Sequence, residues 1–209
     1  MARKIDSTCS QCRRVSEKLF LKGEKCFGPH CAVTRRSYPS GQHGPNKKHR
    51  TKLSGYGKQL LEKQKVKEVY GILERQFANY VAEASIKTGD TSKFLLNYLE
   101  SRLDNVVFRM GLGKSRSAAR QIVNHGHVTV NGKKVDIASF RVRVGDVIGL
   151  TAKAKAKKIF EKIEEQLAKV EAPSWLAIEP KAITGKILNN PTVDHVNFDA
   201  KTIIEFYSR

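Results

Sequence analysis

The spacing of apolar residues changes once along the chain, and this change most limits the folds open to it. Between residues 59 and 86, apolar side chains recur every three or four residues, as on one face of a helix. Between residues 127 and 150 they alternate with polar residues, which is the pattern of half-buried strands. We therefore expect an α+β chain, with a mostly helical part followed by a small part that combines two helices with an antiparallel sheet.

Turn and cap residues divide the helical regions. Gly71 can split the first helical stretch into two helices, because glycine readily takes the left-handed backbone that ends a helix. Two short helices are expected over residues 102–110 and 116–125. Gly111 ends the first of these, and Ser115 is a good N-cap for the second.

Two hairpins are expected in the strand-like region. The first joins residues 127–130 to residues 133–135 through Asn131-Gly132, the dipeptide that a tight hairpin turn favours. The second pairs residues 141–144 with residues 147–150. Both would belong to one small antiparallel sheet.

The last third of the chain gives two further expectations. Residues 152–170 are rich in Lys, Glu and Ala, and we expect one helix there with Ile159 facing inward. The apolar ending, residues 203–207, is strand-like in composition. No course can be assigned to residues 171–197 from the sequence.

Net charge is the strongest indication of a partner. The chain has 39 Lys and Arg against 20 Asp and Glu, which gives a net charge of +19. Residues 1–50 carry +9 and residues 101–150 carry +6, whereas residues 51–100 and 151–209 carry +2 each. A merely soluble basic protein would not need this clustering. Two basic blocks on a nearly neutral frame favour a polyanionic partner such as nucleic acid.

Nothing in the sequence points to a membrane. No run of 18 apolar residues occurs, and no apolar stretch follows the basic start Met-Ala-Arg-Lys-Ile-Asp. We expect neither a secretory signal nor a membrane partner, and hence a cytoplasmic protein.

Four cysteines lie within 23 residues, at Cys9, Cys12, Cys26 and Cys31. Four thiolates complete a tetrahedral zinc site, and a small polar segment without a core needs such a cross-link. We expect one structural zinc ion, and so about one zinc per purified chain. His30 is a rival fourth ligand. An iron–sulfur cluster or a redox pair remains as an alternative use of these thiols.

The N-terminal basic block is rich in Gly and Pro, which lets the backbone approach phosphates closely. We favour an ordered RNA-binding loop, formed on RNA, over a flexible tail that only neutralises charge. The candidate RNA-binding residues of this block are Arg13, Arg14, Arg35, Arg36, Tyr38, Gln42, His43, Lys47, Lys48 and Arg50.

The second basic block coincides with the two short helices and the first hairpin. Cations there can contact phosphates, and neutral donors can reach 2′-hydroxyls and base edges. The candidate RNA-binding residues of this block are Arg102, Asn105, Lys114, Ser115, Arg116, Arg120, Gln121, His125, His127, Asn131 and Lys133.

Three motifs in this block resemble a small RNA-binding domain of about 60 residues. They are Glu100-Ser-Arg-Leu-Asp-Asn105, Gly113-Lys-Ser-Arg-Ser-Ala-Ala-Arg-Gln121 and Gly126-His-Val-Thr-Val-Asn-Gly-Lys133. That domain is shared by a small-subunit ribosomal protein, pseudouridine synthases and tyrosyl-tRNA synthetases. The resemblance implies a module that binds structured RNA.

Motifs at both ends of the chain resemble the bacterial-type small-subunit ribosomal protein four family. They are Leu19-Phe-Leu-Lys-Gly23, Arg35-Arg-Ser-Tyr-Pro39, Gly41-Gln-His-Gly44 and Ile204-Glu-Phe-Tyr-Ser-Arg209. The resemblance implies a ribosome-bound structural protein that binds small-subunit ribosomal RNA early in assembly. It also implies contacts with neighbouring ribosomal proteins, a place near the point where messenger RNA enters, and an effect on translational accuracy. Some members of that family lack the four cysteines.

The expected organisation has three parts. Residues 1–50 form a cysteine-rich and basic extension with a zinc-bound knob. Residues 51–90 form a helical domain that residues 180–209 complete. Residues 91–170 form the RNA-binding domain and its trailing helix.

Two other classes of protein were considered. An RNA-modifying enzyme would need a catalytic domain, and the residues outside the module are too few and too helical to supply a pseudouridine synthase fold. No nucleophile–base set, phosphate-binding loop or dinucleotide motif occurs, so we expect no catalysis. A free translational regulator would carry the same module, but the large basic extension favours burial within folded RNA.

Overall fold

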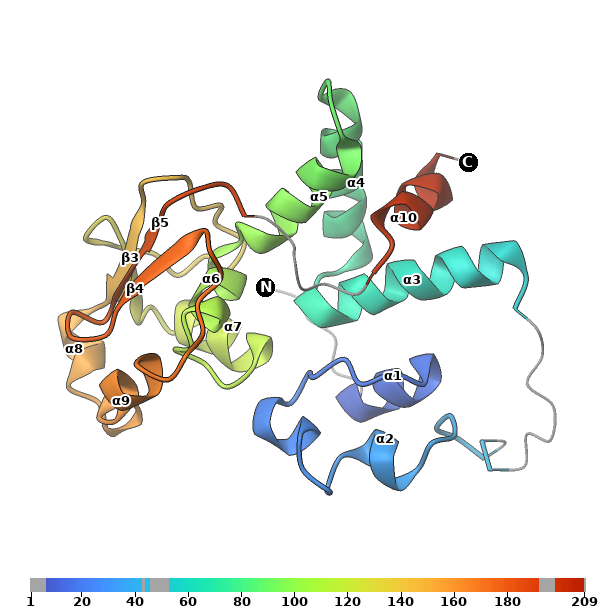
Figure 1. Ribbon diagram of the computed structural model, residues 1–209, viewed down its shortest axis with the longest axis horizontal. Coiled ribbons are helices and arrows are strands. Elements are labelled where there is room, and N and C mark those ends of the chain that lie inside the picture. The colour runs from blue at the N-terminus through green and yellow to red at the C-terminus, as the bar shows by residue number, and fades with distance from the viewer. Residues whose placement is uncertain (1–6, 43, 46–52, 192–197, 209) are drawn as a thin grey trace. The chain divides into compact units, whose positions relative to one another are not determined.

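The computed structural model in Figure 1 describes residues 7–42, 44–45, 53–191 and 198–208. The chain divides into two compact units. Unit 1 consists of Met1–Leu95 together with Val196–Arg209, and unit 2 consists of Leu96–His195. Helix α5 (Thr91–Glu100) runs across the boundary in sequence. Within the described ranges, every helix is too short or too polar to cross a membrane.

Unit 1 begins with short helical turns around the cysteines. Helix α1 (Thr8–Val15), the 3₁₀ turn η1 (Gly23–Cys26) and helix α2 (Ala32–Arg35) lie in the predicted cysteine-rich extension, for which no helix was predicted. Helices α1 and α2 contact each other. These elements have few apolar residues and gave no periodic pattern, because local turns and the packing of the two helices shape them instead.

Two longer helices form the frame of unit 1. Helix α3 (Gly55–Tyr70) begins at Ser54, whose side chain accepts a hydrogen bond from the Gly57 amide. It ends at Gly71, which has a left-handed backbone with φ of 62°. Helix α4 (Glu74–Ile86) follows. The predicted division at Gly71 is therefore confirmed.

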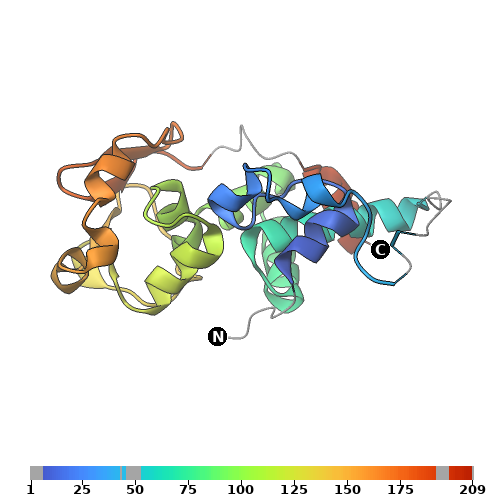
Figure 2. The ribbon, with the colours of Figure 1, turned by 90° about the horizontal axis from the view of Figure 1, so that it is seen from below.

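The chain ends in a helix, so the predicted terminal strand is wrong. Helix α10 (Ala200–Tyr207) is capped by Asp199, whose carboxylate accepts hydrogen bonds from the Lys201 and Thr202 amides. Figures 1 and 2 show α10 beside α3 from two directions, and α10 also contacts α4. The buried side chain of Ile203 faces this frame, and packing on α3 decides the helical state.

A hydrogen-bonded cluster fastens α10 to the start of α4. The Glu74 carboxylate accepts hydrogen bonds from Lys63 Nζ at 2.7 Å, Lys67 Nζ at 2.6 Å and Tyr207 Oη at 2.6 Å. Partial burial acts to raise the pKa of Glu74, but these three hydrogen bonds outweigh it and lower the pKa to about 2. Burial and the same carboxylate raise the pKa of Tyr207. The charged form of Glu74 therefore stabilises the folded state.

The Glu74 cluster predicts a pH dependence of stability. The pKa of Glu74 is about 2 in the folded chain against an ordinary value of 4.5, so its contribution is complete above pH 4.5 and is lost as pH falls toward 2. Urea titrations between pH 5 and pH 2 should show a steeper loss of unfolding free energy in the wild type than in Glu74→Gln. Glu164→Gln, at an exposed position in unit 2, is the control and should follow the wild type. Parallel curves for the wild type and Glu74→Gln would contradict the prediction.

Unit 2 starts with two short helices that match the sequence prediction. Helix α6 (Leu103–Arg109) is followed by Gly111 with φ of 81°. Helix α7 (Arg116–Asn124) is capped by Ser115, whose hydroxyl accepts a hydrogen bond from the Ala118 amide at 3.2 Å. Helices α6 and α7 pack against each other. The predicted end of α6 at Gly111 and the predicted start of α7 at Ser115 are both confirmed.

An antiparallel sheet covers these helices, with strand order β2-β1-β3-β5-β4. Its strands are β1 (Val128–Val130), β2 (Lys133–Lys134), β3 (Val147–Leu150), β4 (Leu176–Glu179) and β5 (Thr184–Ile187). The predicted hairpin of β1 and β2 is confirmed, and Asn131 and Gly132 both have positive φ in its turn. The hairpin of β4 and β5 arises from a segment to which the sequence assigned no course.

The second predicted hairpin is wrong. Residues 141–144 do not pair with β3, which lies between β1 and β5. Arg141 instead forms an isolated bridge with Arg102. The Asp146 carboxylate accepts a hydrogen bond from the Arg143 amide at 2.7 Å and closes the turn. Strand β5 is more distant in sequence, so local alternation did not reveal the true neighbour of β3.

The segment between β3 and β4 is also not the single helix that was predicted. It consists of α8 (Ala152–Lys155), the 3₁₀ turn η2 (Lys158–Phe160) and α9 (Ile163–Leu167). Ala154 and Phe160 are both buried, yet in one continuous helix they would lie about 120° apart. The break lets both reach the core, and it leaves Ile159 exposed, contrary to expectation.

Candidate nucleic-acid interface

Two buried carboxylates organise the base of α6 and α7. Glu100 is 1% exposed and accepts hydrogen bonds from Arg109 Nε at 3.1 Å and Arg109 Nη2 at 3.0 Å. Asp104 accepts hydrogen bonds from Arg102 Nε at 3.0 Å and Arg102 Nη2 at 2.6 Å. Such bidentate pairs hold guanidinium groups in fixed orientations.

Two further arginines reach the same carboxylates more loosely. Arg116 Nη2 lies 4.0 Å from Glu100 Oε1, and Arg120 Nη1 lies 3.9 Å from Asp104 Oδ2. These ion pairs therefore link four arginines to two carboxylates and leave an excess of positive charge. Arg116 and Arg120 are partly exposed on α7, so the excess faces solvent along that helix. A fixed cationic surface of this kind suits phosphate groups.

The same network gives internal partners to predicted RNA-binding residues. Arg102 and Asn105 are both 2% exposed. Asn105 donates to the Glu100 carboxylate and main chain, and its carbonyl accepts from Arg116 Nε at 2.8 Å. We therefore leave Arg102 and Asn105 out of the proposed contact surface. The sequence analysis did not select Glu100 or Asp104 as site residues. They lie four residues apart, Glu100 just before α6 and Asp104 within it.

The outer side of α7 and the first hairpin keep exposed donors. Lys114, Gln121, His125 and Lys133 are exposed, whereas Ser115 is buried as a helix cap. Lys134 is exposed beside Lys133 and was not among the predicted residues, although it continues the same basic run. We call the exposed set, with Arg116 and Arg120, the α7 surface.

Asn131 and His127 have structural roles. The Asn131 amide donates to Asp146 Oδ1 at 2.8 Å, and its carbonyl accepts from the Val147 amide at 2.9 Å, so Asn131 ties the β1–β2 turn to β3. His127 is partly exposed and lies 3.3 Å from Lys157 Nζ. Burial, followed by the charges of Lys157, His125 and Lys134, lowers the pKa of His127. A neutral imidazole at this position acts as a hydrogen-bonding group and adds no charge.

In unit 1, Arg13 and Tyr38, both predicted to bind RNA, contact each other. Arg13 donates from Nε to the Tyr38 carbonyl at 2.8 Å and from Nη2 to the Pro39 carbonyl at 3.0 Å. Its guanidinium also lies 4.9 Å from the centre of the Tyr38 ring. Arg13 therefore fastens the loop after α2 to α1 and gives that loop a defined start.

The remaining candidates of the N-terminal block divide into two groups. Arg14, Arg35, Arg36 and Gln42 are exposed and available to a partner. His43, Lys47, Lys48 and Arg50 lie outside the described residues.

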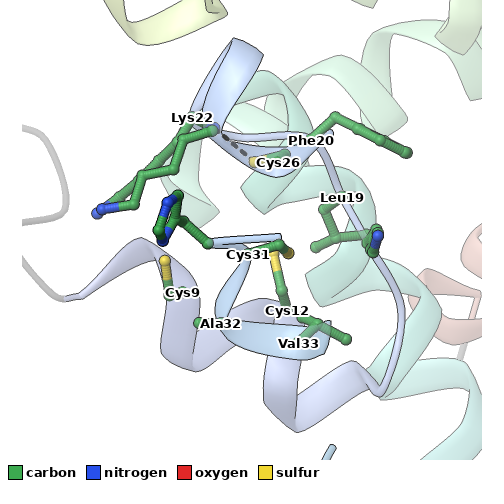
Figure 3. Close-up of a pocket in the computed structure, with 12 residues that line it drawn as sticks. Cys9, Cys12, Leu19, Phe20, Lys22, Cys26, Cys31, Ala32 and Val33 are labelled. Carbon is green, nitrogen blue, oxygen red and sulfur yellow. Dashed lines mark hydrogen bonds between the residues drawn. The ribbon is translucent and has the colours of Figure 1, made fainter. Parts of the chain in front are cut away.

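The four cysteines line one small cavity of about 20 Å³ (Figure 3). All four are free thiols, and Cys12, Cys26 and Cys31 are buried. The sulfur of Cys26 accepts a hydrogen bond from the Lys22 amide at 3.3 Å. Among the described residues, no three Cys, His, Asp or Glu side chains converge closely enough to form a metal-binding group. The cavity thus gathers four soft donors, together with His30, without a preformed coordination sphere.

The local structure shifts the pKa values of two thiols of this cavity, Cys12 and Cys31, in opposite directions. Burial raises the pKa of Cys12, and the neighbouring thiols Cys26, Cys9 and Cys31 add to the rise against a hydrogen bond from Leu19. Cys31 precedes α2, and its burial also acts to raise its pKa. Hydrogen bonds from Thr34 and Val33 outweigh that effect, and the pKa of Cys31 is lowered.

Comparison with known proteins gives the class to which these features belong. A family model described as "Ribosomal protein S4/S9 N-terminal domain" matches residues 3–100, and one described as "S4 domain" matches residues 101–148. Helices α6 and α7, the hairpin of β1 and β2, and the α7 surface therefore lie within a stretch that matches an S4 domain, which follows a stretch that matches a ribosomal protein N-terminal domain.

Full-length relatives identify the family. Proteins named "Small ribosomal subunit protein uS4" are similar to this chain at 49% identity in Acetivibrio thermocellus, 48% in Thermodesulfovibrio yellowstonii and 46% in Syntrophomonas wolfei. In each case the match covers 100% of this chain and 100% of the relative. The chain belongs to the uS4 family of small ribosomal subunit proteins, as the resemblance in the sequence indicated.

Proposed function

We propose that this chain is a structural constituent of the small ribosomal subunit that binds small-subunit ribosomal RNA directly. The observation that carries the proposal is the match to uS4 proteins over the full length of the chain. The family consists of structural ribosomal proteins, so no catalytic role is assigned. The working location is the ribosome in the cytoplasm.

The α7 surface supplies the RNA contacts of unit 2. Its ion-pair network keeps more positive than negative charge beside exposed lysines and neutral donors. Phosphates are bound by Lys114, Lys133 and the outward parts of Arg116 and Arg120, while Gln121 and His125 are placed for 2′-hydroxyls or base edges. In unit 1, Arg14, Arg35, Arg36 and Gln42 form a second contact surface.

A structural zinc ion in unit 1 is the second part of the proposal. The four thiols lining one cavity support it, because four cysteine sulfurs are the ligand set of many structural zinc sites. Cys9, Cys12, Cys26 and Cys31 would hold the ion and cross-link α1, η1 and the start of α2. A bound dication would also relieve the repulsion between neighbouring thiolates.

Finer aspects of the function rest on the family resemblance alone. They are early binding of ribosomal RNA that helps to nucleate assembly, and contacts with neighbouring small-subunit proteins. They also include a position near the messenger RNA entry site and an effect on translational accuracy.

The salt dependence of RNA binding tests the α7 surface. Lys114→Ala with Lys133→Ala should weaken binding to small-subunit ribosomal RNA and reduce the slope of log affinity against log salt by roughly one unit per lost phosphate contact. These lysines are better test positions than Arg116 or Arg120, whose removal also disturbs buried carboxylates. Filter binding at several salt concentrations gives the slope.

The test has a control variant and two outcomes that would contradict it. Lys162→Ala, an exposed lysine outside the α7 surface, is the matched control and should leave the slope unchanged. An unchanged slope in the double variant would remove the α7 surface from the interface. Recovery of the chain mainly free of ribosomal particles, when cell extract is sedimented in magnesium, would instead contradict the ribosomal assignment itself.

A further inference from the structure

Two phenylalanines stack on the surface of the cysteine-rich segment. Phe27 is 75% exposed and Phe20 is 45% exposed. Their ring centroids lie 4.8 Å apart, with 31° between the ring planes. Aromatic rings of this size are normally buried, so a stacked pair left in solvent needs an explanation. Packing within the segment does not supply one, because Phe27 stays mostly exposed and Phe20 stays half-exposed.

The backbone presents Phe20 outward at some conformational cost. Phe20 has φ of 50°, in the left-handed region that residues with a side chain rarely adopt. The preceding residue, Leu19, is buried and lines the cysteine cavity. Phe20 also lines that cavity, but it is 45% exposed, whereas Leu19 is 7% exposed. The turn therefore buries Leu19 and leaves Phe20 half-exposed beside the cavity.

The surroundings of the pair are cationic. Lys18, Lys22 and Lys25 are exposed in the same short stretch. The same stretch holds two acidic residues, Glu24, which is exposed, and Glu17, whose Oε2 lies 2.6 Å from Lys65 Nζ. Protein–protein interfaces are depleted of lysine, whereas single-stranded nucleic-acid sites combine lysine and arginine with exposed aromatic rings. The charge and the rings together fit an unpaired base and its backbone better than they fit a protein partner.

We propose that Phe20 and Phe27 form a stacking platform for an unpaired base of the RNA, with Lys18, Lys22 and Lys25 placed for the flanking phosphates. This inference rests on the proposed function and deepens it, because it names a single-stranded element as the target of unit 1. Stacking on a ring is independent of base identity, so the platform binds an exposed base without reading its sequence.

Substitutions at Phe27 test the platform in the full-length chain, purified with zinc and mixed with protein-free small-subunit ribosomal RNA. Phe27→Ala and Phe27→Leu should each bind about tenfold more weakly with an unchanged salt slope, because a ring is lost and no cation is. Phe27→Trp should bind like the wild type. Its added fluorescence, taken as the difference from the wild-type signal of the buried Trp175, should be quenched by the RNA. Ile86→Ala, at an exposed apolar position in the same unit, is the matched control.

The outcomes separate this inference from the proposed function. A wild-type chain that does not bind the RNA would contradict the proposed function. Wild-type affinity in Phe27→Ala, with no quenching in Phe27→Trp, would overturn the platform alone. Wild-type RNA affinity in Phe27→Ala combined with loss of a neighbouring protein from assembled particles would make the surface a protein contact, which also overturns it. Equal weakening in Phe27→Leu and Phe27→Ala supports stacking, whereas full affinity in Phe27→Leu would mean that any apolar side chain suffices and would overturn it.

Discussion

Replacing Glu100 with alanine is expected to destabilise unit 2 by about 3–5 kcal/mol, the range for removing one partner of a buried ion pair. Glu100 is almost completely buried and accepts two hydrogen bonds from Arg109 and one from Asn105. Without it, Arg109 loses its bidentate partner and Arg116 loses the carboxylate that lies 4.0 Å from its Nη2. Denaturant titration followed by circular dichroism, with hydrogen exchange at α6 and α7, measures the effect.

Two comparisons sharpen the Glu100 prediction. Glu100→Gln keeps the shape and part of the hydrogen bonding, so its loss of stability should lie between the wild type and Glu100→Ala. Asp136→Ala, at an exposed acidic position in the same unit, should change stability little. A loss under about 1 kcal/mol in Glu100→Ala would show that the arginines are held by other groups and that Glu100 does not organise the α7 surface.

Removing zinc is expected to have an effect of similar or larger size, confined at first to unit 1. Structural zinc contributes about 10–16 kcal/mol of apparent binding free energy in small zinc-dependent peptides. The segment from α1 to α2 has few buried apolar side chains of its own, so the proposed metal would supply much of its stability. Treatment with a strong chelator should abolish hydrogen-exchange protection in α1 and α2, expose the four thiols to alkylation, and lower the affinity for ribosomal RNA.

The zinc prediction also has a matched pair of variants. Cys12→Ser should bind less than one zinc per chain and lose the same protection, whereas Ser10→Ala, two residues away on α1, should keep both. Metal analysis of the wild type that finds no zinc, with α1 and α2 protected in the presence of chelator, would remove the site. If metal analysis finds iron in place of zinc, the cross-link by the four cysteines stands but the predicted identity of the metal is wrong.

The parts of the fold that were predicted correctly depend on a few adjacent residues. Gly71 ends a helix because of its own backbone freedom, Ser115 caps α7 through an amide three residues away, and Asn131-Gly132 closes a two-residue turn. Each interaction lies within a short window of sequence. Local preferences and the tertiary structure agree at these positions, so sequence patterns were sufficient.

The parts that were predicted wrongly depend on distant neighbours. Residues 203–207 contain adjacent β-branched and aromatic residues, but Asp199 caps them as a helix that packs on α3. Strand β3 pairs with β5 and not with residues 141–144. The segment after β3 breaks so that Ala154 and Phe160 can both be buried. Propensity and periodicity carry no information about such long-range packing.

The candidate site shows the same division. Exposed cations such as Lys114 and Arg14 could be selected from sequence, since basic residues are rarely buried. Arg102 could not be separated from them, because its burial depends on Asp104 and on the bridge that its main chain makes with Arg141. The exposed pair of Phe20 and Phe27 was equally hidden, as aromatic residues in a sequence are normally assigned to a core.

The two ends of unit 1 have a consequence for how the chain is made. Helix α3 is synthesised before unit 2 and α10 after it, yet the two helices pack together, and Tyr207 completes the Glu74 cluster. Unit 2 consists of one continuous stretch between them and contains its own core. During synthesis unit 2 therefore has all of its residues before α10 is made, whereas unit 1 can complete its packing only after α10 has followed. A chain cut between unit 2 and α10 would keep the residues that match the S4 domain but would lack the helix that completes the packing of unit 1.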